Sequence, residues 1–315
     1  MSAITGAINK LASSFSRIHQ LPRLEAINLQ FTEIRYQTLF NGEAHRSLQA
    51  SLLGALADSF HVHVPSKLMS LYLLNLRTFG PHPLETLQSQ TILTTSRRLK
   101  LSVVFELNYP DVPVPFYLLN NFWGSLSLRM IPVQMQVILT DLVLHSDGLF
   151  GTTSTLSFSE LHFPCLSKLS LRDIVFTTTS PGAEDFILRH STTLTLLELF
   201  TCKVLMSNNA SLLLSQSEST NLAMDVEWRR RPYWDRIWDR FAAELTSLIT
   251  LHVDERFSQY VHMIGSSYFI RNTGESRNAA DRAALQHFRM TVTTRLIGGA
   301  SEGKAAPDQC RQELH

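Results

Sequence analysis

Several side chains in this sequence have types and spacings that could do chemistry. His61 and His63 form an HxH pair, and on a strand both imidazoles would lie on one side, where they could share a metal ion. No acid or cysteine follows at ligand spacing, so we expect no metal site. Cys202 occupies an apolar position of a leucine pattern, which favours a buried core residue over a nucleophile. Glu184 and Asp185 stand at an expected helix start, where acids favour the helix dipole.

Three common signatures of catalytic and cofactor sites are missing. The chain contains no GxGxxG, no GxxxxGK[ST] and no HExxH, the patterns of dinucleotide, phosphate and zinc sites. We therefore predict a protein without catalytic residues, without a cofactor and without enzymatic activity. An α/β enzyme that carries no recognisable motif is an alternative hypothesis.

Segment 226–240, VEWRRRPYWDRIWDR, contains five arginines and three tryptophans, which could stack on nucleotides and contact phosphates. A second interpretation follows from the helical period. Apolar residues at i, i+3, i+4, i+7 and i+11 form one helical face, and charged residues form the solvated side. The apolar face comprises Trp234, Ile237, Trp238, Phe241 and Leu245, and the solvated side comprises Asp235, Arg236, Asp239 and Arg240. We expect this buried aromatic face, and nucleic-acid binding through 226–240 is an alternative.

The elements that would position these residues follow from the composition. The chain has 315 residues, of which 44% are hydrophobic and 17% are charged, enough apolar surface for a sizeable core. Its 28 basic and 27 acidic residues give a net charge of +1, which argues against a protein built mainly to bind nucleic acid or anionic lipid. The three cysteines lie far apart without a CxxC, so neither a disulfide framework nor a cysteine zinc site is indicated. No apolar run is long enough to cross a membrane, and we expect a cytoplasmic or nuclear protein.

Leucine is the dominant residue, with 49 copies that recur in a spaced phrase. Residues 194–202, LTLLELFTC, follow LxxLxLxxC, the core pattern of a leucine-rich repeat. Related phrases occur at 24–31, 71–79, 139–147, 163–174 and 248–256. Two further segments, RRLKLSVVF (97–105) and GSLSLRM (124–130), are candidate strands outside the strict register. We place the third apolar position of each phrase at residues 29, 76, 144, 171, 199 and 253.

The spacing of these phrases supports a repeat. The steps from 144 to 171 and from 171 to 199 are 27 and 28 residues, inside the range of leucine-rich repeats. The step from 199 to 253 is 54 residues, which leaves room for a degenerate repeat around Leu222–Trp228. The step from 29 to 76 is 47 residues and leaves room for one irregular unit.

A short strand with one apolar face cannot bury that face alone, but stacked units form a continuous core. We therefore predict an α/β leucine-rich-repeat-like solenoid, with irregular repeats of about 27 residues, parallel strands on the concave face and helices outside. The expected organisation is a solenoid over 1–260, a closing loop and helix over 261–297, and a disordered tail over 298–315. Within the closing part, 265–276 is expected to be a loop.

Strand residues between the buried leucines should point to the concave face, where a partner would dock. This rule gives a ladder of Asn28, Gln30, Asn75, Arg77, Val143, His145, Ser170, Arg172, Glu198, Phe200, His252 and Asp254. The mixture of charges with one aromatic residue suits a protein epitope better than a greasy pocket. We predict that the partner-binding residues are Arg77, Arg172, Glu198 and Phe200.

The sequence also resembles a known family. AEDFILRHSTTLTLLELFTC (183–202), WDRIWDRFAAELTSLITLHV (234–253) and the closing DRAALQHF (281–288) resemble the repeat region of fungal F-box/leucine-rich-repeat-like proteins, over about residues 15–297. The resemblance implies the substrate-recognition part of an SCF-type ubiquitin ligase, with the SCF adaptor and cullin as partners if an F-box equivalent exists. LPRLEAINLQF (21–31) starts with Leu-Pro but continues as a repeat strand, so no docking residue is carried over. The expected function is a protein-binding scaffold, with no membrane contact and no nucleic acid.

Overall fold

The structure is a computed structural model that divides into two compact units. Unit 1 is Met1–Phe150 with Ser154–Leu156 and Glu160–Leu166, and unit 2 is Gly151–Thr153, Ser157–Ser159 and Ser167–His315. The described residues are 2–31, 39–62, 67–77, 92–104, 122–124, 126, 130–150, 158, 161–177, 182–207, 233–254, 259–264, 267–271 and 275–302. Each unit is an α/β structure with parallel strands, as the sequence predicts at this coarse level.

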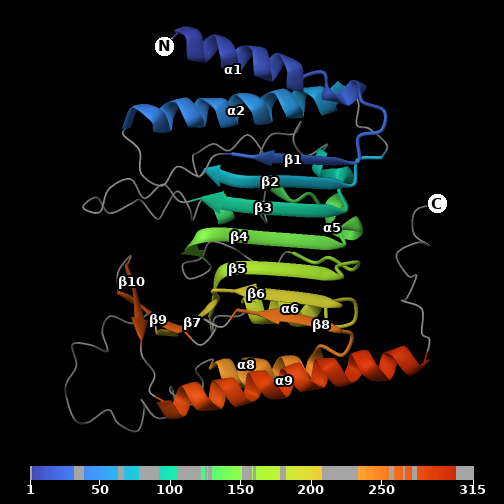
Figure 1. The fold of residues 1–315 in the computed structure, drawn as a ribbon, viewed down its shortest axis with the longest axis vertical. Coiled ribbons are helices and arrows are strands. Elements are labelled where there is room, and N and C mark those ends of the chain that lie inside the picture. Colours follow the sequence, from blue (N-terminus) through green and yellow to red (C-terminus); the bar gives the residue numbers. More distant parts are fainter. Residues whose placement is uncertain are drawn as a thin grey trace. The chain divides into compact units, whose positions relative to one another are not determined.

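Unit 1 is built on four parallel strands in the order β1-β2-β3-β4 (Figure 1). Its elements are α1 (Ser2–Phe15), the 3₁₀ turn η1 (Ile18–Gln20), β1 (Ala26–Gln30), α2 (Leu39–Val62), β2 (Ser70–Arg77), β3 (Arg98–Val104), α5 (Val133–Ile138) and β4 (Asp141–Phe150). Helix α1 packs on α2. The strands lie at the expected leucine phrases because alternating leucines bury one face of each strand.

The strands of unit 1 share one register. Leu29 pairs with Leu73, Leu73 with Leu101, and Leu101 with Leu144. The third apolar position of β2 is therefore Leu73, not residue 76, and β3 enters the repeat register 28 residues later. Our expectation for β2 was wrong because both Leu71 and Leu73 point into the core and are almost fully buried.

In the described residues, the long steps from 29 to 76 and from 199 to 253 contain no further strand of the ladder. Strand β1 pairs directly with β2, and the residues between them include α2. Strand β6 (Leu196–Phe200) likewise pairs directly with β8 (Thr250–Val253), through Leu199 and Val253. The step from 29 to 76 therefore contains α2 rather than a further strand in the described residues, and the degenerate repeat expected around Leu222–Trp228 lies outside the described residues.

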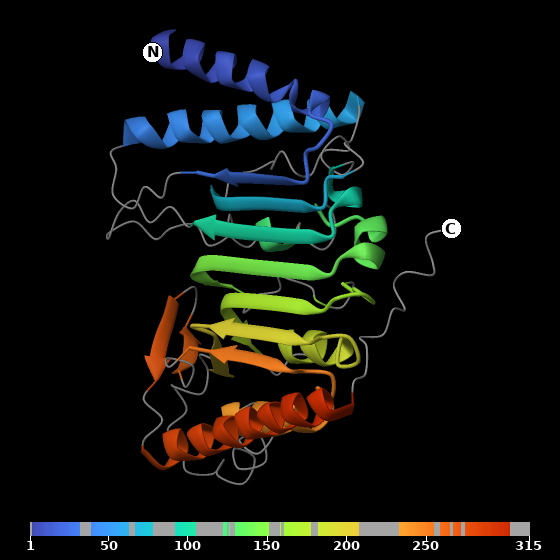
Figure 2. The same cartoon turned by 45° about the vertical axis from the view of Figure 1, so that its right-hand side comes forward.

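In unit 2, β5 (Lys168–Phe176), β6 and β8 form a parallel ladder in which Leu171 pairs with Leu199 (Figure 2). A second set of strands branches from the end of β5. It comprises β7 (Lys203–Ser207), β9 (Gln259–Ile264) and β10 (Ser267–Arg271), with β9 and β10 antiparallel. The loop expected over 265–276 is wrong for this reason, since 267–271 forms a strand paired with β9.

The same left-handed backbone conformation recurs at one residue within β2, one within β5 and one directly after β6. Asn75, Asp173 and Thr201 adopt φ values of 58°, 58° and 48°, each two residues after a buried leucine of the phrase. The next residue in each case is buried: Leu76, Ile174 or Cys202. The left-handed residue therefore bends the chain so that one more apolar side chain enters the core.

The burial of Cys202 at this position determines the state of its thiol. Cys202 is buried, and its Sγ–H donates to the carbonyl of Leu171 at 3.7 Å. Burial raises the pKa of this thiol to about 12, so it is a core residue, as the sequence predicts, and not a thiolate nucleophile. Cys165 is disulfide-bonded, which the wide spacing of the cysteines did not predict.

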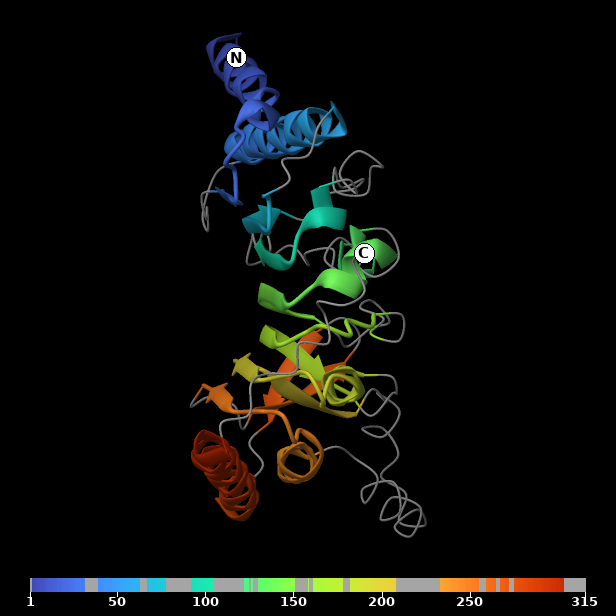
Figure 3. The same cartoon turned by 90° about the vertical axis from the view of Figure 1, so that its right-hand side faces the viewer.

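Helices α6 (Ala183–Arg189), α8 (Trp234–Glu244) and α9 (Glu275–Glu302) complete unit 2, with α8 and α9 side by side (Figure 3). Trp234 and Trp238 stack with ring centroids 4.8 Å apart, and Trp238 packs on Phe288 of α9. All three rings are fully buried, so the expected apolar face of α8 is confirmed. The tail expected over 298–315 begins inside α9, which ends at Glu302, so that expectation is wrong for 298–302.

Partners distant in sequence cap both ends of α8. The first two amides of the helix donate to Tyr260 Oη at 3.0 Å and to Asp281 Oδ1 at 3.1 Å. At the other end, Arg295 donates to the carbonyls of Ala242 and Leu245 at 2.6 Å. These contacts satisfy amide and carbonyl groups that a helix leaves without internal partners. Asp235 forms an ion pair with Arg277 and is half-buried, so its expected place on the solvated side is wrong.

Candidate functional site

One face of the β5-β6-β8 ladder in unit 2 presents polar and aromatic side chains. Successive side chains of a strand alternate between faces. The leucines of β5 and β6 are buried on one face, and the residues between them point to the other. We call this second face the open face of unit 2 and define it by Arg172, Glu198, Phe200 and His252.

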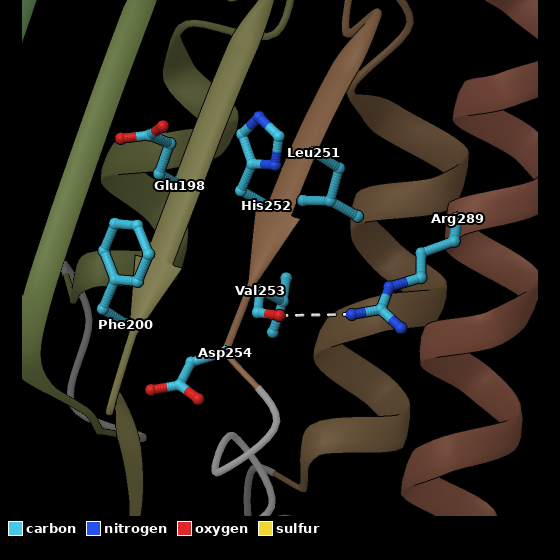
Figure 4. A pocket seen from close by; sticks show the side chains of 7 residues that line it. All are labelled: Glu198, Phe200, Leu251, His252, Val253, Asp254 and Arg289. Atoms are coloured by element: carbon cyan, nitrogen blue, oxygen red, sulfur yellow. Dashed lines mark hydrogen bonds between the residues drawn. The ribbon is translucent and has the colours of Figure 1, made fainter.

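A shallow groove lies at this face, between β6, β8 and α9 (Figure 4). Figure 4 shows Glu198 and Phe200 on β6 facing the same way as His252 on β8, with Asp254 just after β8. On the far side of the groove, Arg289 of α9 donates from Nη2 to the carbonyl of Val253 at 3.2 Å. The lining residues are Glu198, Phe200, Leu251, His252, Val253, Asp254 and Arg289.

Arg172 and Phe200 form the centre of the open face. They are direct partners in the β5–β6 register. The guanidinium carbon of Arg172 lies 5.4 Å from the centroid of the Phe200 ring, within the range of a cation–π contact. Arg172 is exposed and Phe200 is half-buried, so both side chains can meet another molecule.

The carboxylates of this region have different surroundings. Glu198 stands between Ser170 and His252 in the ladder and is half-exposed. No residue in the described ranges forms an ion pair with it. Asp173 lies within β5, and burial raises the pKa of its carboxyl, while a hydrogen bond with Thr201 and the nearby Lys203 and Arg172 oppose that rise.

Three of the four predicted partner-binding residues therefore lie together, and the fourth does not. Arg77 belongs to unit 1, where it is only 5% exposed. Its backbone exchanges two hydrogen bonds with the side chain of Gln49 on α2. Between Leu73 and Leu76, β2 contains one residue more than β3, which puts Leu76 in register with the buried Val103 and leaves Arg77 beside Val104 on the opposite face. That face is not open at this point, since Val104 is buried as well. The expectation that Arg77 is exposed is wrong.

The other residues that alternation along the strands predicts to be exposed differ in their actual exposure. Asn28, Gln30 and His252 are exposed, whereas Asn75, Val143, His145 and Asp254 are half-buried. Ser170 is buried at 4% exposure, although it lies on the expected face. Its short side chain is a direct ladder neighbour of the longer Glu198. The face of a residue followed from the sequence, but its exposure depended on the size of its neighbours.

The structure does not support a metal site at the histidine pair or a nucleophile at Ser301. His61 lies in the last turn of α2 and not on a strand, and His63 lies outside the described residues. The described ranges contain no group of three His, Cys, Asp or Glu residues that could hold a metal ion. Residues 299–303, GASEG, match GxSxG, but the first four belong to α9 and lack the strand–turn–helix context of a nucleophile elbow.

The Trp/Arg-rich segment is only partly available for stacking. Trp234 and Trp238 are fully buried, so neither ring can receive a nucleotide base. Arg240 forms ion pairs with Glu184, Asp185 and Glu244. Residues 226–232 lie outside the described ranges.

Sequence reasoning missed Arg289 as a member of the site. A helix over 281–297 was expected, but nothing local indicates which of its residues faces β8. In the structure, Arg289 is exposed and directly follows the buried Phe288.

In the described part of the chain, no helix has the length and apolar character required to span a membrane. A scan against protein-family models, a search of curated proteins and a search of solved structures each found no match to this chain.

Proposed function

We propose that this protein is a non-enzymatic scaffold that binds another protein through the open face of unit 2. The observation that carries the proposal is the contiguous set of Arg172, Glu198, Phe200 and His252 on adjacent strands. An exposed arginine against an aromatic ring, bordered by a carboxylate, has the composition of a protein-binding surface. The proposal includes no catalytic residue and no cofactor.

The proposed architecture is a leucine-rich-repeat-like solenoid. Its support is the common register of the leucine phrases, in which Leu29, Leu73, Leu101 and Leu144 align in unit 1. The left-handed residue that follows the phrase in β2, β5 and β6 adds a second repeated feature. Stacked units of this kind present a surface of adjacent strands, which suits an extended partner.

The proposed cellular role is substrate recognition for an SCF-type ubiquitin ligase, in the cytoplasm or nucleus. Its support is the resemblance of 183–202 and 234–253 to F-box/leucine-rich-repeat-like proteins. In this role the open face would hold the substrate, and the SCF adaptor and cullin would be further partners. Arg77 is left out of the proposed surface because it is buried.

The test is a tagged pull-down from native cells, followed by mass spectrometry of the co-purifying proteins. We compare the wild type with Arg172→Glu on the open face and with Arg282→Glu, an exposed arginine on α9. Arg172→Glu should reduce recovery of a reproducible partner at least about fivefold, because it reverses a charge at the centre of the surface. Arg282→Glu should leave recovery unchanged, and both variants should keep the wild-type Tm.

The outcomes separate the parts of the proposal. Enrichment of the adaptor and cullin supports the ligase role, and a reproducible partner without them supports a scaffold outside a ligase. Equal recovery with wild type and Arg172→Glu contradicts the open face as the binding surface. A fall in Tm for Arg172→Glu contradicts the assigned facing of β5.

A further inference from the structure

The strand starts of unit 1 carry an excess of positive charge. Five basic residues that are exposed or half-buried lie within three residues of the start of β1, β2 or β3: Arg23, Lys67, Arg97, Arg98 and Lys100. We call this surface the basic edge of unit 1. We propose that it binds an acidic, extended segment of a protein partner that also carries an apolar residue. The proposal goes beyond the function proposed above, since it concerns unit 1 and not the open face of unit 2.

Backbone hydrogen bonds hold the three strand starts together. The amide of Met69 donates to the carbonyl of Glu25, and the amide of Arg97 donates to the carbonyl of Met69, both at 2.9 Å. Arg23 and Lys67 each stand two residues before a member of this chain of hydrogen bonds. Neighbouring strands of a sheet are about 4.8 Å apart, so the three basic residues lie along one edge of the ladder.

The acids of this region do not neutralise the basic edge. Asp141 accepts a 2.7 Å hydrogen bond from Thr140 Oγ1 and lies 3.8 Å from Arg98 Nε, so its charge is already engaged. Glu25 is the other acid at these strand starts among the described residues. Four basic residues of the edge form no ion pair within the part of the chain that the structure describes: Arg23, Lys67, Arg97 and Lys100. The edge should therefore attract a segment with several carboxylates.

The charge balance of the wider unit has the same sign. The remaining acids of unit 1 with described side chains are Asp58 on α2 and Asp147, which lies about 20 Å along β4 from the start of that strand. Lys10 and Arg17 add two exposed basic side chains. Among the exposed and half-buried side chains described in unit 1, Lys and Arg outnumber Asp and Glu seven to four.

Exposed apolar side chains at the same edge favour a protein segment over a nucleic acid. Met69 is 42% exposed and stands between Lys67 and Arg97 in the edge, and Leu21, two residues before Arg23, is 52% exposed. A protein segment can place an apolar side chain on Met69 while its carboxylates meet the neighbouring cations. Single-stranded nucleic acids gain affinity by stacking bases on aromatic rings, whereas these two exposed side chains are aliphatic.

The experiment is a fluorescence-anisotropy titration of labelled probes with the full-length protein. The first probe is a peptide in which glutamates flank a single leucine, and the second has glutamine in place of every glutamate. The third is a single-stranded oligonucleotide with the net charge of the first. The variants are Arg97→Glu, Lys67→Glu and Met69→Ser. The matched control is Lys10→Glu, which reverses an exposed charge on α1 in the same unit.

The wild type should bind the acidic peptide most tightly, and the Kd should rise with salt because exposed charges are screened. Arg97→Glu and Lys67→Glu should each raise this Kd at least about fivefold, because they place a negative charge against the carboxylates. Met69→Ser should raise it about twofold through the loss of apolar contact. Lys10→Glu should leave it unchanged, and all four variants should keep the wild-type Tm because the substituted side chains are exposed.

Three outcomes overturn the proposal. The acidic peptide may show no saturable binding, the glutamine peptide may bind equally well, or both charge-reversal variants may bind the acidic peptide as the wild type does. Tighter binding of the oligonucleotide, weakened by the same two variants, also overturns it and assigns the basic edge to a nucleic acid. The pull-down with Arg172→Glu concerns unit 2, so its result and this one are independent.

Discussion

The ladders of the two units are built by the same leucine phrase but present different open faces. In unit 1, one row across four strands contains Asn28, Tyr72, Lys100 and Val143. In unit 2, the corresponding row contains Ser170, Glu198 and His252. The third apolar positions align in both ladders, and only the residues between them differ. Buried leucines therefore define the strands, while the outward residues give each ladder its chemistry.

The units also differ in how their helices are held. In unit 2, Tyr260, Asp281 and Arg295 cap both ends of α8 from β9 and α9. The first helix of unit 1, α1, packs on α2, and Ile8 is its buried apolar residue among those with described side chains. The stability of unit 2 should therefore depend strongly on a few buried polar groups. The following experiments examine this difference, in order of expected effect.

The largest effect is expected for Asp281→Ala in unit 2. Asp281 is fully buried, accepts a 2.7 Å hydrogen bond from Tyr260 Oη and an amide hydrogen bond from Asp235, and lies 3.4 Å from Arg277 Nη2. Removal of one buried partner leaves the others uncompensated, which costs about 3–5 kcal/mol. The loss should appear in the free energy of unfolding in urea. Asp239→Ala, at an exposed position, should change that free energy by less than about 0.5 kcal/mol.

A comparable loss in both units is expected when a leucine of the phrase is truncated. Leu171→Ala in unit 2 and Leu101→Ala in unit 1 should each cost about 2–5 kcal/mol, because both side chains are almost fully buried. Chemical denaturation measures both values. A cost below about 1 kcal/mol for either variant would show that its strand does not use the phrase as core.

The smallest effect concerns two left-handed residues, Asn75 within β2 and Thr201 directly after β6. Thr201 is β-branched at φ 48°, so Thr201→Gly should stabilise the protein by about 0.5–1 kcal/mol. Asn75 adopts φ 58° but also donates from Nδ2 to the carbonyl of Phe31 at 2.9 Å. Asn75→Ala should therefore destabilise by about 1 kcal/mol. Thermal denaturation of the two variants measures this contrast, and shifts of the same sign would contradict it.

Much of the strand pattern was predictable from local spacing. Each leucine phrase contains a strand, and the segment 97–105, expected outside the register, is β3 within it. The apolar face of α8 also followed from its helical period. In the candidate site, the shared face of Arg172, Glu198 and Phe200 was predictable, because β5 and β6 pair without a register shift as far as Arg172 and Phe200. The burial of Arg77 was not, because it depends on tertiary contacts such as those of its backbone with Gln49 on α2.

The sequence alone determined that the leucine phrases become the strands of the two ladders and that most of their leucines enter the core. Burial of alternating leucines requires only local geometry and a repeating period. The bulge of β2, the pairing of β10 with β9, the capping of α8 and the position of Arg289 beside Val253 arose only in the folded chain. Each of these joins groups through contacts or hydrogen bonds that no local pattern encodes, because the partner lies on another element. The open face of unit 2 thus consists of strands that the leucine spacing predicts, and it is bordered by α9, whose position depends on tertiary packing.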